Sequence, residues 1–198
     1  GKYKKTDIVH NTRFKNLEII PSNLSLSKAE LYTSQIINAH TRLNDYLHQV
    51  VFMYDYVIID CPPSLGLFTL NALISSDYVM IPVVPEKYAV MAVSQMMETI
   101  KIARSFNDKL QLAGIVPSIL DMRYRIHRST MDTLKANFGN LLLTDYYIGT
   151  NAPLKDAANV KKTIFEYETR AASYKQFQNL AQYVYRLLRA DENAEKGS

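Results

Sequence analysis

The apolar residues of this chain follow two patterns, short continuous runs and longer stretches at helical spacing. The runs are rich in β-branched residues, which is typical of strands buried in a parallel sheet. Strands are predicted at Leu17–Ile20, Tyr56–Asp60, Tyr78–Val84, Leu110–Leu120 and Leu141–Tyr147, with a last short strand at Ile164–Phe165. Between the runs, apolar positions recur every three or four residues and predict helices.

Capping residues help to place these helices. Ser25 and Ser27 suit the start of a helix reaching about Val50, and Gly139 suits the end of another. Helices are predicted at about 25–50, 67–75, 89–106 and 123–138, in a short segment from Pro153, and from near Thr169 to a frayed end after Ala190. Strands that alternate with helices predict an α/β fold, a mostly parallel sheet with helices on both faces. Pro82 inside its run predicts an edge strand or a bulge.

The run Tyr56–Asp60 ends in a carboxylate, and Pro62 and Pro63 then prevent the strand from continuing. An α/β sheet places its chemistry outside the carboxyl ends of its strands. An apolar strand that closes on Asp is the Walker B pattern, whose carboxylate holds Mg²⁺ beside nucleotide phosphates. The alternative is an Asp that only caps the next helix.

Together with Pro62-Pro63-Ser64-Leu65-Gly66, this stretch resembles the ParA-type partition ATPases, within the ParA/MinD group that carries a deviant Walker A motif. The resemblance covers most of the chain. It includes Leu17–Leu24, Asp77–Glu86, Gly114–Val116 followed by Ser118, Asp121 and Arg123, and the spaced positions Ile148, Asn151, Leu154 and Ala157. It implies a P-loop NTPase-like fold of the SIMIBI/ParA type in a single ATPase domain over residues 1–198.

The glycine-rich phosphate loop of this family, KGG-x-GK[ST], does not occur in these residues. Gly1–Thr6 contains a Gly, a Lys and a Thr but no glycine cradle and no preceding strand, so we reject it as this loop. The resemblance therefore implies an N-terminally incomplete fold whose sheet lacks its central strand. We do not expect hydrolysis by this chain alone, because phosphoryl transfer depends on positioning by the missing part.

The resemblance also assigns roles at a site for ATP and Mg²⁺. Asp60 is the implied catalytic and metal-binding residue, and Ser64 is placed near the γ-phosphate. The implied neighbours of the base are Pro85, Glu86, Ser118, Asp121 and Arg123. An alternative for Asp121 and Arg123 is a simple turn-and-cap pair.

The net charge is +4, and basic ends surround an acidic middle. Residues 17–100 hold three Lys or Arg and eight acids, whereas residues 101–135 hold seven and three. This distribution suggests a face suited to polyanions, although a solvated surface of mixed sign is the alternative. ParA-type proteins bind non-specific DNA as ATP-bound dimers, and the matching C-terminal region carries Lys155, Lys161, Lys162, Arg170, Lys175 and Arg186.

Further expectations concern partners and location. The resemblance implies a nucleotide-dependent homodimer, a centromere-binding ParB-like protein and a cytoplasmic, nucleoid-associated location. No apolar run approaches the roughly 20 residues that span a bilayer, and the single Cys61 fits a reducing compartment. A MinD-like membrane-site ATPase would carry an amphipathic C-terminal extension, and residues 191–198 have no apolar face. A non-catalytic interaction protein with the same fold is the other alternative.

Overall fold

The computed structural model describes residues 8–23, 25–33 and 36–196. The chain divides into two compact units, one formed by residues 1–76 with 103–108 and the other by residues 77–102 with 109–198. The single domain over residues 1–198 remains a prediction. The rejected phosphate-loop candidate Gly1–Thr6 lies outside the described residues.

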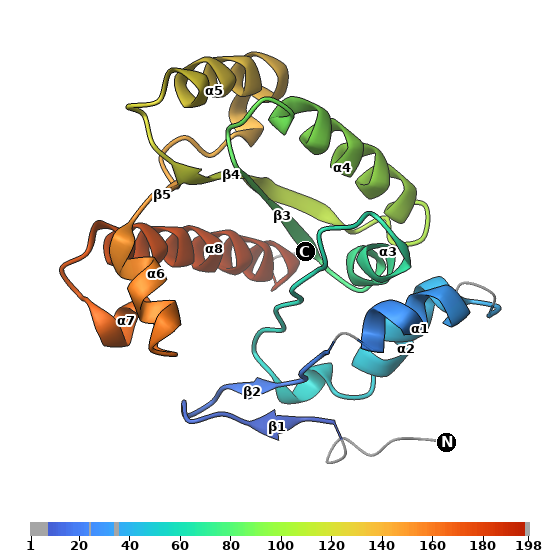
Figure 1. Cartoon of the computed structure of the whole chain (residues 1–198). Helices are drawn as coiled ribbons and strands as arrows, with labels where there is room; N and C mark the ends of the chain where they lie inside the picture. The colour runs from blue at the N-terminus through green and yellow to red at the C-terminus, as the bar shows by residue number, and fades with distance from the viewer. Residues whose placement is uncertain (1–7, 24, 34–35, 197–198) are drawn as a thin grey trace. The chain divides into compact units, whose positions relative to one another are not determined.

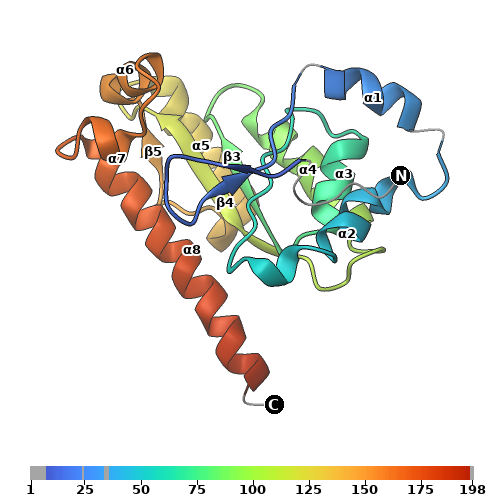
Figure 2. The same cartoon turned by 90° about the horizontal axis from the view of Figure 1, so that it is seen from below.

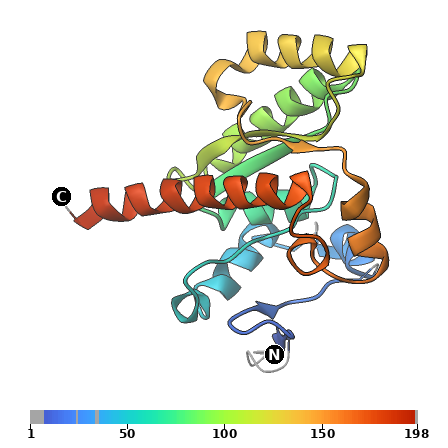
Figure 3. The same ribbon diagram turned by 90° about the vertical axis from the view of Figure 1, so that its left-hand side faces the viewer.

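The second unit is built on a three-stranded parallel sheet. Its strands β3 (Tyr78–Val83), β4 (Gln111–Leu120) and β5 (Ile148–Gly149) pair in the order β3-β4-β5. Helices α4 (Ala89–Ala103) and α5 (Arg125–Phe138) lie on one face and α8 (Ala172–Lys196) on the other, as Figures 1 and 3 show. The predicted α/β fold, a parallel sheet with helices on both faces, is confirmed.

The core of this unit gathers around β4, whose apolar run predicted a strand buried on both faces. Ile115 of β4, Val93 and Ile100 of α4, and Leu134 of α5 are almost completely buried. On the opposite face, the Tyr183 hydroxyl of α8 donates a hydrogen bond to the backbone oxygen of Ala113. Helices therefore cover both sides of the central strand, which explains why its sequence shows no alternation of polar and apolar residues.

Strand β3 lies at an edge of the described sheet, and its pairing with β4 shifts register between Val79 and Met80. The prediction that Pro82 marks an edge strand or a bulge is therefore confirmed. Proline lacks an amide hydrogen, and an edge strand has a side on which none is required.

The remaining helices close the second unit. They are η4 (Gly139–Leu141), α6 (Ala152–Asn159) and α7 (Ile164–Tyr167), and Figure 2 shows α6 and α7 beside the N-terminal end of α8. Gly139 caps α5 with a φ of 53°, and Pro153 lies in the first turn of α6, both as expected. Helix α8 begins at Ala172 and continues to Lys196, beyond the expected end near Ala190.

Two expected strands of this unit are wrong. Residues 141–147 contribute only an isolated bridge between Leu142 and Ile115, and the paired strand is Ile148–Gly149. The predicted strand at 164–165 is instead the start of α7, because Thr163 and Glu166 form a capping box. Reciprocal hydrogen bonds of this kind satisfy the first free amides of a helix and favour it locally.

The first unit contains a short antiparallel pair, β1 (His10–Asn11) with β2 (Glu18–Ile19), so the strand expected at 17–20 is confirmed in shortened form. Its helices are α1 (Ser25–Thr33), η2 (Ala39–Thr41), α2 (Arg42–Leu47), η3 (Val51–Met53) and α3 (Leu67–Ile74). The single helix expected over 25–50 is broken, and Asn38 between its parts adopts a left-handed φ of 59°. The buried Asn71 amide of α3 bonds the backbone of Ala39 and Leu43.

The strand predicted at Tyr56–Asp60 does not form. No ladder pairs this segment in the described part of the chain, and Tyr56, Val57 and Ile58 are exposed, Ile58 to 93%. A strand is defined by its neighbours, since its backbone amides and carbonyls must be paired across a ladder. This segment has the composition of a buried strand, but among the described residues no strand pairs with it.

Candidate functional site

Parallel pairing brings the ends of β3, β4 and β5 to one edge of the sheet. The register places Val83 of β3 beside Pro117 of β4, and Ser118 beside Ile148 of β5. The structure therefore brings together, at this carboxyl edge, the predicted base-side residues Pro85, Glu86, Ser118, Asp121 and Arg123. Pro85 is buried and Glu86 exposed, at the entry to α4. Ligands of open α/β sheets bind outside such an edge.

Asp121 and Arg123 form an ion pair in the turn after β4. The Arg123 Nη2 donates to Asp121 Oδ2 at 2.6 Å, and the Arg123 Nε lies 2.9 Å from Oδ1. The Arg123 backbone amide donates to the same Oδ1 at 3.0 Å. These bonds from Arg123 lower the pKa of Asp121 to about 2, and the carboxylate raises the pKa of Arg123. The contact that the turn-and-cap alternative expected between Asp121 and Arg123 is therefore confirmed. The role of these two residues beside the base remains a prediction.

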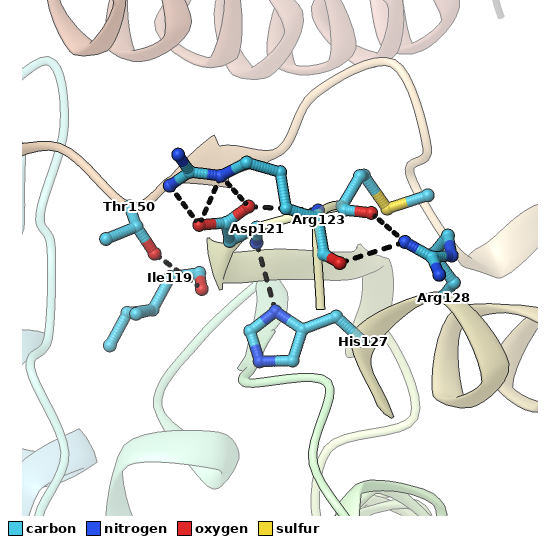
Figure 4. A network of polar contacts seen from close by, with 7 residues as sticks. Ile119, Asp121, Arg123, His127, Arg128 and Thr150 are labelled. Carbon is cyan, nitrogen blue, oxygen red and sulfur yellow. Dashed lines mark hydrogen bonds and ion pairs between the residues drawn. The ribbon is translucent and has the colours of Figure 1, made fainter. Parts of the chain in front are cut away.

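Two residues that the sequence did not assign to the site support this turn (Figure 4). The Asp121 backbone amide donates a hydrogen bond to His127 Nδ1 at 3.0 Å. Arg128 Nη1 donates to the carbonyls of Met122 at 2.7 Å and Arg123 at 3.0 Å. The crowding of Arg and His in residues 123–128 was the one sequence feature that pointed to His127 and Arg128. Their individual contacts could not be predicted, because they depend on how the turn folds.

The end of β4 is strained at Ile119. This β-branched residue has a left-handed φ of 54°, at the point where the register between β4 and β5 shifts. Such a φ is a genuine outlier for a β-branched side chain. Thr150 holds the chain there, since its hydroxyl donates to the Ile119 oxygen at 3.1 Å and its amide to the Leu120 oxygen at 2.9 Å. Strain held by surrounding contacts is often found at functional sites.

Asp60 and Ser64 belong to the first unit. Both are exposed, and the Ser64 backbone oxygen accepts a hydrogen bond from the buried Thr69 hydroxyl, which ties the Pro62-Pro63 turn to α3. Partial burial of the Cys61 thiol and the adjacent Asp60 carboxylate raise the pKa of Cys61. The thiol is therefore protonated at neutral pH, which makes it a poor nucleophile.

The donors at this turn fit Mg²⁺ bound together with a nucleotide. Mg²⁺ prefers oxygen ligands and is usually held by one or two carboxylates plus substrate phosphates. Asp60 supplies an exposed carboxylate and Ser64 a hydroxyl. Within the described ranges, no group of three His, Cys, Asp or Glu residues could hold a metal by itself. A site for Mg²⁺ here needs the phosphates as co-ligands.

The six residues predicted to bind DNA are all exposed and all lie in the second unit. Lys155 is on α6, Lys161 and Lys162 are between α6 and α7, and Arg170 is between α7 and α8. Lys175 lies near the start of α8, so these five gather where α6, α7 and the start of α8 meet (Figures 1 and 2). Arg186 lies 11 residues further along α8, about 16 Å away at a rise of roughly 1.5 Å per residue.

Backbone contacts fix the shape of this basic cluster. Lys162 donates its amide to the Ala157 oxygen and Lys161 to Ala158, a Schellman ending of α6 with Lys161 at a left-handed φ of 53°. Glu166 accepts from the Thr163 amide at 2.8 Å, and Glu168 accepts from the Arg170 amide at 3.0 Å. Two of the local carboxylates are thus directed to backbone amides.

No helix in the described part of the chain combines the length and the apolar character that a membrane crossing requires.

A family model described as an AAA domain matches residues 1–112. The sporulation initiation inhibitor protein Soj of Bacillus subtilis is 35% identical over 179 residues, which are 90% of this chain and 70% of Soj. The chromosome partitioning protein ParA of Myxococcus xanthus is 32% identical over 166 residues, 83% of this chain and 58% of that protein.

Among solved structures, cobyrinic acid a,c-diamide synthase from Mycobacterium smegmatis, with a bound ATP analog and magnesium, is 29% identical. Its TM-score is 0.62, and the match covers 70% of this chain and 57% of that one. The chain thus spans between 57% and 70% of the length of these three proteins.

Proposed function

Because this chain belongs to the ParA-type family of partition ATPases, we propose that the protein binds ATP with Mg²⁺, dimerises with nucleotide bound and then contacts DNA without sequence preference. In this way it would segregate plasmids or chromosomes, on the nucleoid in the cytoplasm and together with a centromere-binding ParB-like protein. The observation that carries the proposal is the 35% identity to Soj over 90% of the chain.

The nucleotide half of the proposal concerns two groups of predicted residues, each taken within its own unit. Asp60 would hold Mg²⁺, with Ser64 close to the terminal phosphate, and the bound ion would neutralise charge on the phosphates. At the carboxyl edge of the sheet, Pro85 and Ser118 would pack against the base, and the Asp121–Arg123 pair would keep that turn in place. We propose hydrolysis for the family's complete site and nucleotide binding for the residues present here.

The DNA half uses the basic cluster at the start of α8. Between residues 155 and 175 the chain holds five Lys or Arg and three acids. The five cations are exposed, so a phosphate backbone can approach them, and Glu166 and Glu168 accept hydrogen bonds from the backbone amides of Thr163 and Arg170. Contacts to phosphates carry no sequence information and weaken steeply with salt, as expected for a protein that binds DNA of any sequence.

The test is charge reversal in this cluster. Replacing Lys161, Lys162 and Arg170 together by Glu should abolish ATP-dependent binding to a double-stranded DNA fragment at moderate salt. The single variant Lys161→Gly should lower the salt slope by about one unit, because one phosphate contact is lost. Glycine adopts the left-handed φ of residue 161 without strain, and a thermal unfolding midpoint equal to that of the parent would show that a loss of affinity is not a consequence of misfolding.

The matched control reverses three other exposed cations of the same unit, Lys87, Lys101 and Lys135. This control should retain DNA binding, and both triple variants should retain binding of a fluorescent ATP analogue with Mg²⁺. A cluster variant with an unchanged salt slope would place the DNA surface elsewhere. A protein that bound neither nucleotide nor DNA would favour the non-catalytic interaction protein.

A further inference from the structure

The turn between β4 and α5 exposes an unusual set of side chains. Within ten residues, four apolar side chains are exposed by about half, Ile119 by 57%, Met122 by 51%, Tyr124 by 58% and Ile126 by 48%. Exposed arginines stand among them. We call this surface the arginine knuckle and define it as Ile119, Met122, Tyr124, Arg125, Ile126 and Arg128.

The arginine knuckle is held in one shape. Arg128 bonds the carbonyls of Met122 and Arg123, and the Tyr124 ring lies edge-on to His127 with 5.5 Å between the ring centroids. Beneath the knuckle, the Asp121 amide is bonded to His127 (Figure 4). These contacts fix the backbone that presents the apolar side chains. A preorganised surface loses less conformational entropy when a partner binds, so its exposure favours association.

The knuckle carries a positive charge that nothing within its own segment balances. The one acid between residues 119 and 128 is Asp121, and its carboxylate is engaged with Arg123. Arg125 and Arg128 therefore contribute positive charge that Asp121 does not balance, to which the N-terminus of the 14-residue helix α5 adds a partial positive charge. A partner that fits this surface must present negative groups.

The amino-acid composition of the arginine knuckle favours a protein partner over a nucleic acid. Tyr, Met and Arg are enriched at the centres of protein interfaces, whereas Lys is depleted, and the segment 119–128 has three Arg and no Lys. Phosphates would engage the arginines but would leave the aliphatic side chains of Ile119, Met122 and Ile126 without a counterpart. The basic cluster at α8, in contrast, consists mainly of lysines.

We propose that the arginine knuckle is a docking surface for a segment of another protein in which carboxylates alternate with apolar side chains. Its apolar groups would cover the exposed Ile, Met and Tyr side chains, and its carboxylates would pair with Arg125 and Arg128. Peptide binding is measured without nucleotide and without DNA, so it can fail or succeed independently of the proposed partition function.

The test uses fluorescence anisotropy with a labelled amphipathic peptide of about 16 residues in which Glu and Leu alternate. A peptide of the same composition in scrambled order and a single-stranded oligonucleotide serve as comparison probes. We expect the amphipathic peptide to bind at least fivefold more tightly than the scrambled one, and to weaken as salt rises. Arg125→Glu should reduce its affinity at least tenfold, and Ile126→Ser several-fold.

The matched control is Arg186→Glu, which reverses an exposed arginine on α8 and should leave peptide affinity unchanged. Thermal unfolding of Arg125→Glu should match that of the parent, since the side chain is exposed. Equal affinity for both peptides, or peptide binding that survives Arg125→Glu, would overturn the proposal. Oligonucleotide binding that is lost in Arg125→Glu, without peptide binding, would assign the surface to nucleic acid instead.

Discussion

At the scale of single residues, Asp121 shows how one side chain organises a turn. It sits at the end of β4, its carboxylate accepts bonds from the backbone and the side chain of Arg123, and its amide reaches His127. The Asp-x-Arg spacing made the Asp121–Arg123 contact predictable, because residues two apart in a tight turn can pair. The roles of His127 and Thr150 were not predictable, since each acts on a backbone group whose position depends on the tertiary fold.

The Asp121–Arg123 pair predicts a specific loss of stability in acid. The pKa of Asp121 falls from 3.8 to about 2 on folding, so ionised Asp121 stabilises the folded state fully above pH 4. This contribution should disappear as the pH drops from about 4 to about 2, because the native state must then take up a proton that the unfolded chain already holds. Urea unfolding midpoints measured at half-unit intervals from pH 5 to pH 2 would show the decline.

The variants Asp121→Asn and Arg123→Gln provide the comparison. The first removes the titrating group and the second removes its main partner, so both should give a shallower decline between pH 4 and pH 2 than the parent. Parallel profiles for all three proteins would mean that the pair does not contribute to stability.

At the scale of elements, prediction succeeded where local sequence alone determines the structure. The helices at 67–75 and 89–106 appear as α3 and α4 within three residues, and the run 110–120 is β4. It failed where a local contact overrode the pattern, as in the capping box that makes Ile164–Tyr167 a helix. It also failed at 141–147, because the continuous pairing with β4 starts only at Ile148. The apolar content of residues 141–147 does not show where that pairing starts.

Gly114 provides an element-scale prediction about how β4 packs. Its φ of 147° is rarely adopted by residues with a side chain, and an added Cβ would lie 2.6 Å from the Leu143 side chain. Gly114→Ala should therefore destabilise the chain by roughly 1–3 kcal/mol, the usual range for overpacking a core. Urea unfolding monitored by circular dichroism would measure the difference.

A double-mutant cycle separates the two causes. Leu143→Ala removes the atoms that would clash, so Gly114→Ala should cost less in that background, while the cost of the unfavourable φ should remain. An equal cost in both backgrounds would show that the clash is relieved by a shift of Leu143 and that only the backbone matters. Gly139→Ala is a useful reference, because its φ is also positive but no atom lies within 4 Å of the added Cβ.

At the scale of the whole molecule, sequence alone predicted the parallel sheet and both layers of helices in the second unit. The first unit shows the limit of that approach. The pattern in Tyr56–Asp60 correctly describes a strand that needs neighbours on both sides, but no pattern within one segment states whether those neighbours are present. In the described residues of the first unit, the ladder is confined to β1 and β2.

The unpaired segment predicts how the 198-residue chain behaves in solution. Ile58 is 93% exposed, and the adjacent Tyr56 and Val57 are 48% and 42% exposed. Exposed apolar segments with unpaired backbone groups associate with their own kind, unless a charge interrupts them. We therefore expect the chain to form oligomers at tens of micromolar protein, and Ile58→Lys to reduce their fraction several-fold, as measured by size-exclusion chromatography with light scattering.

Met91→Lys is the matched control, since Met91 is 55% exposed on α4, where the helix already satisfies the backbone. A monomeric parent chain, or equal suppression by Met91→Lys, would show that the segment 56–58 does not drive association.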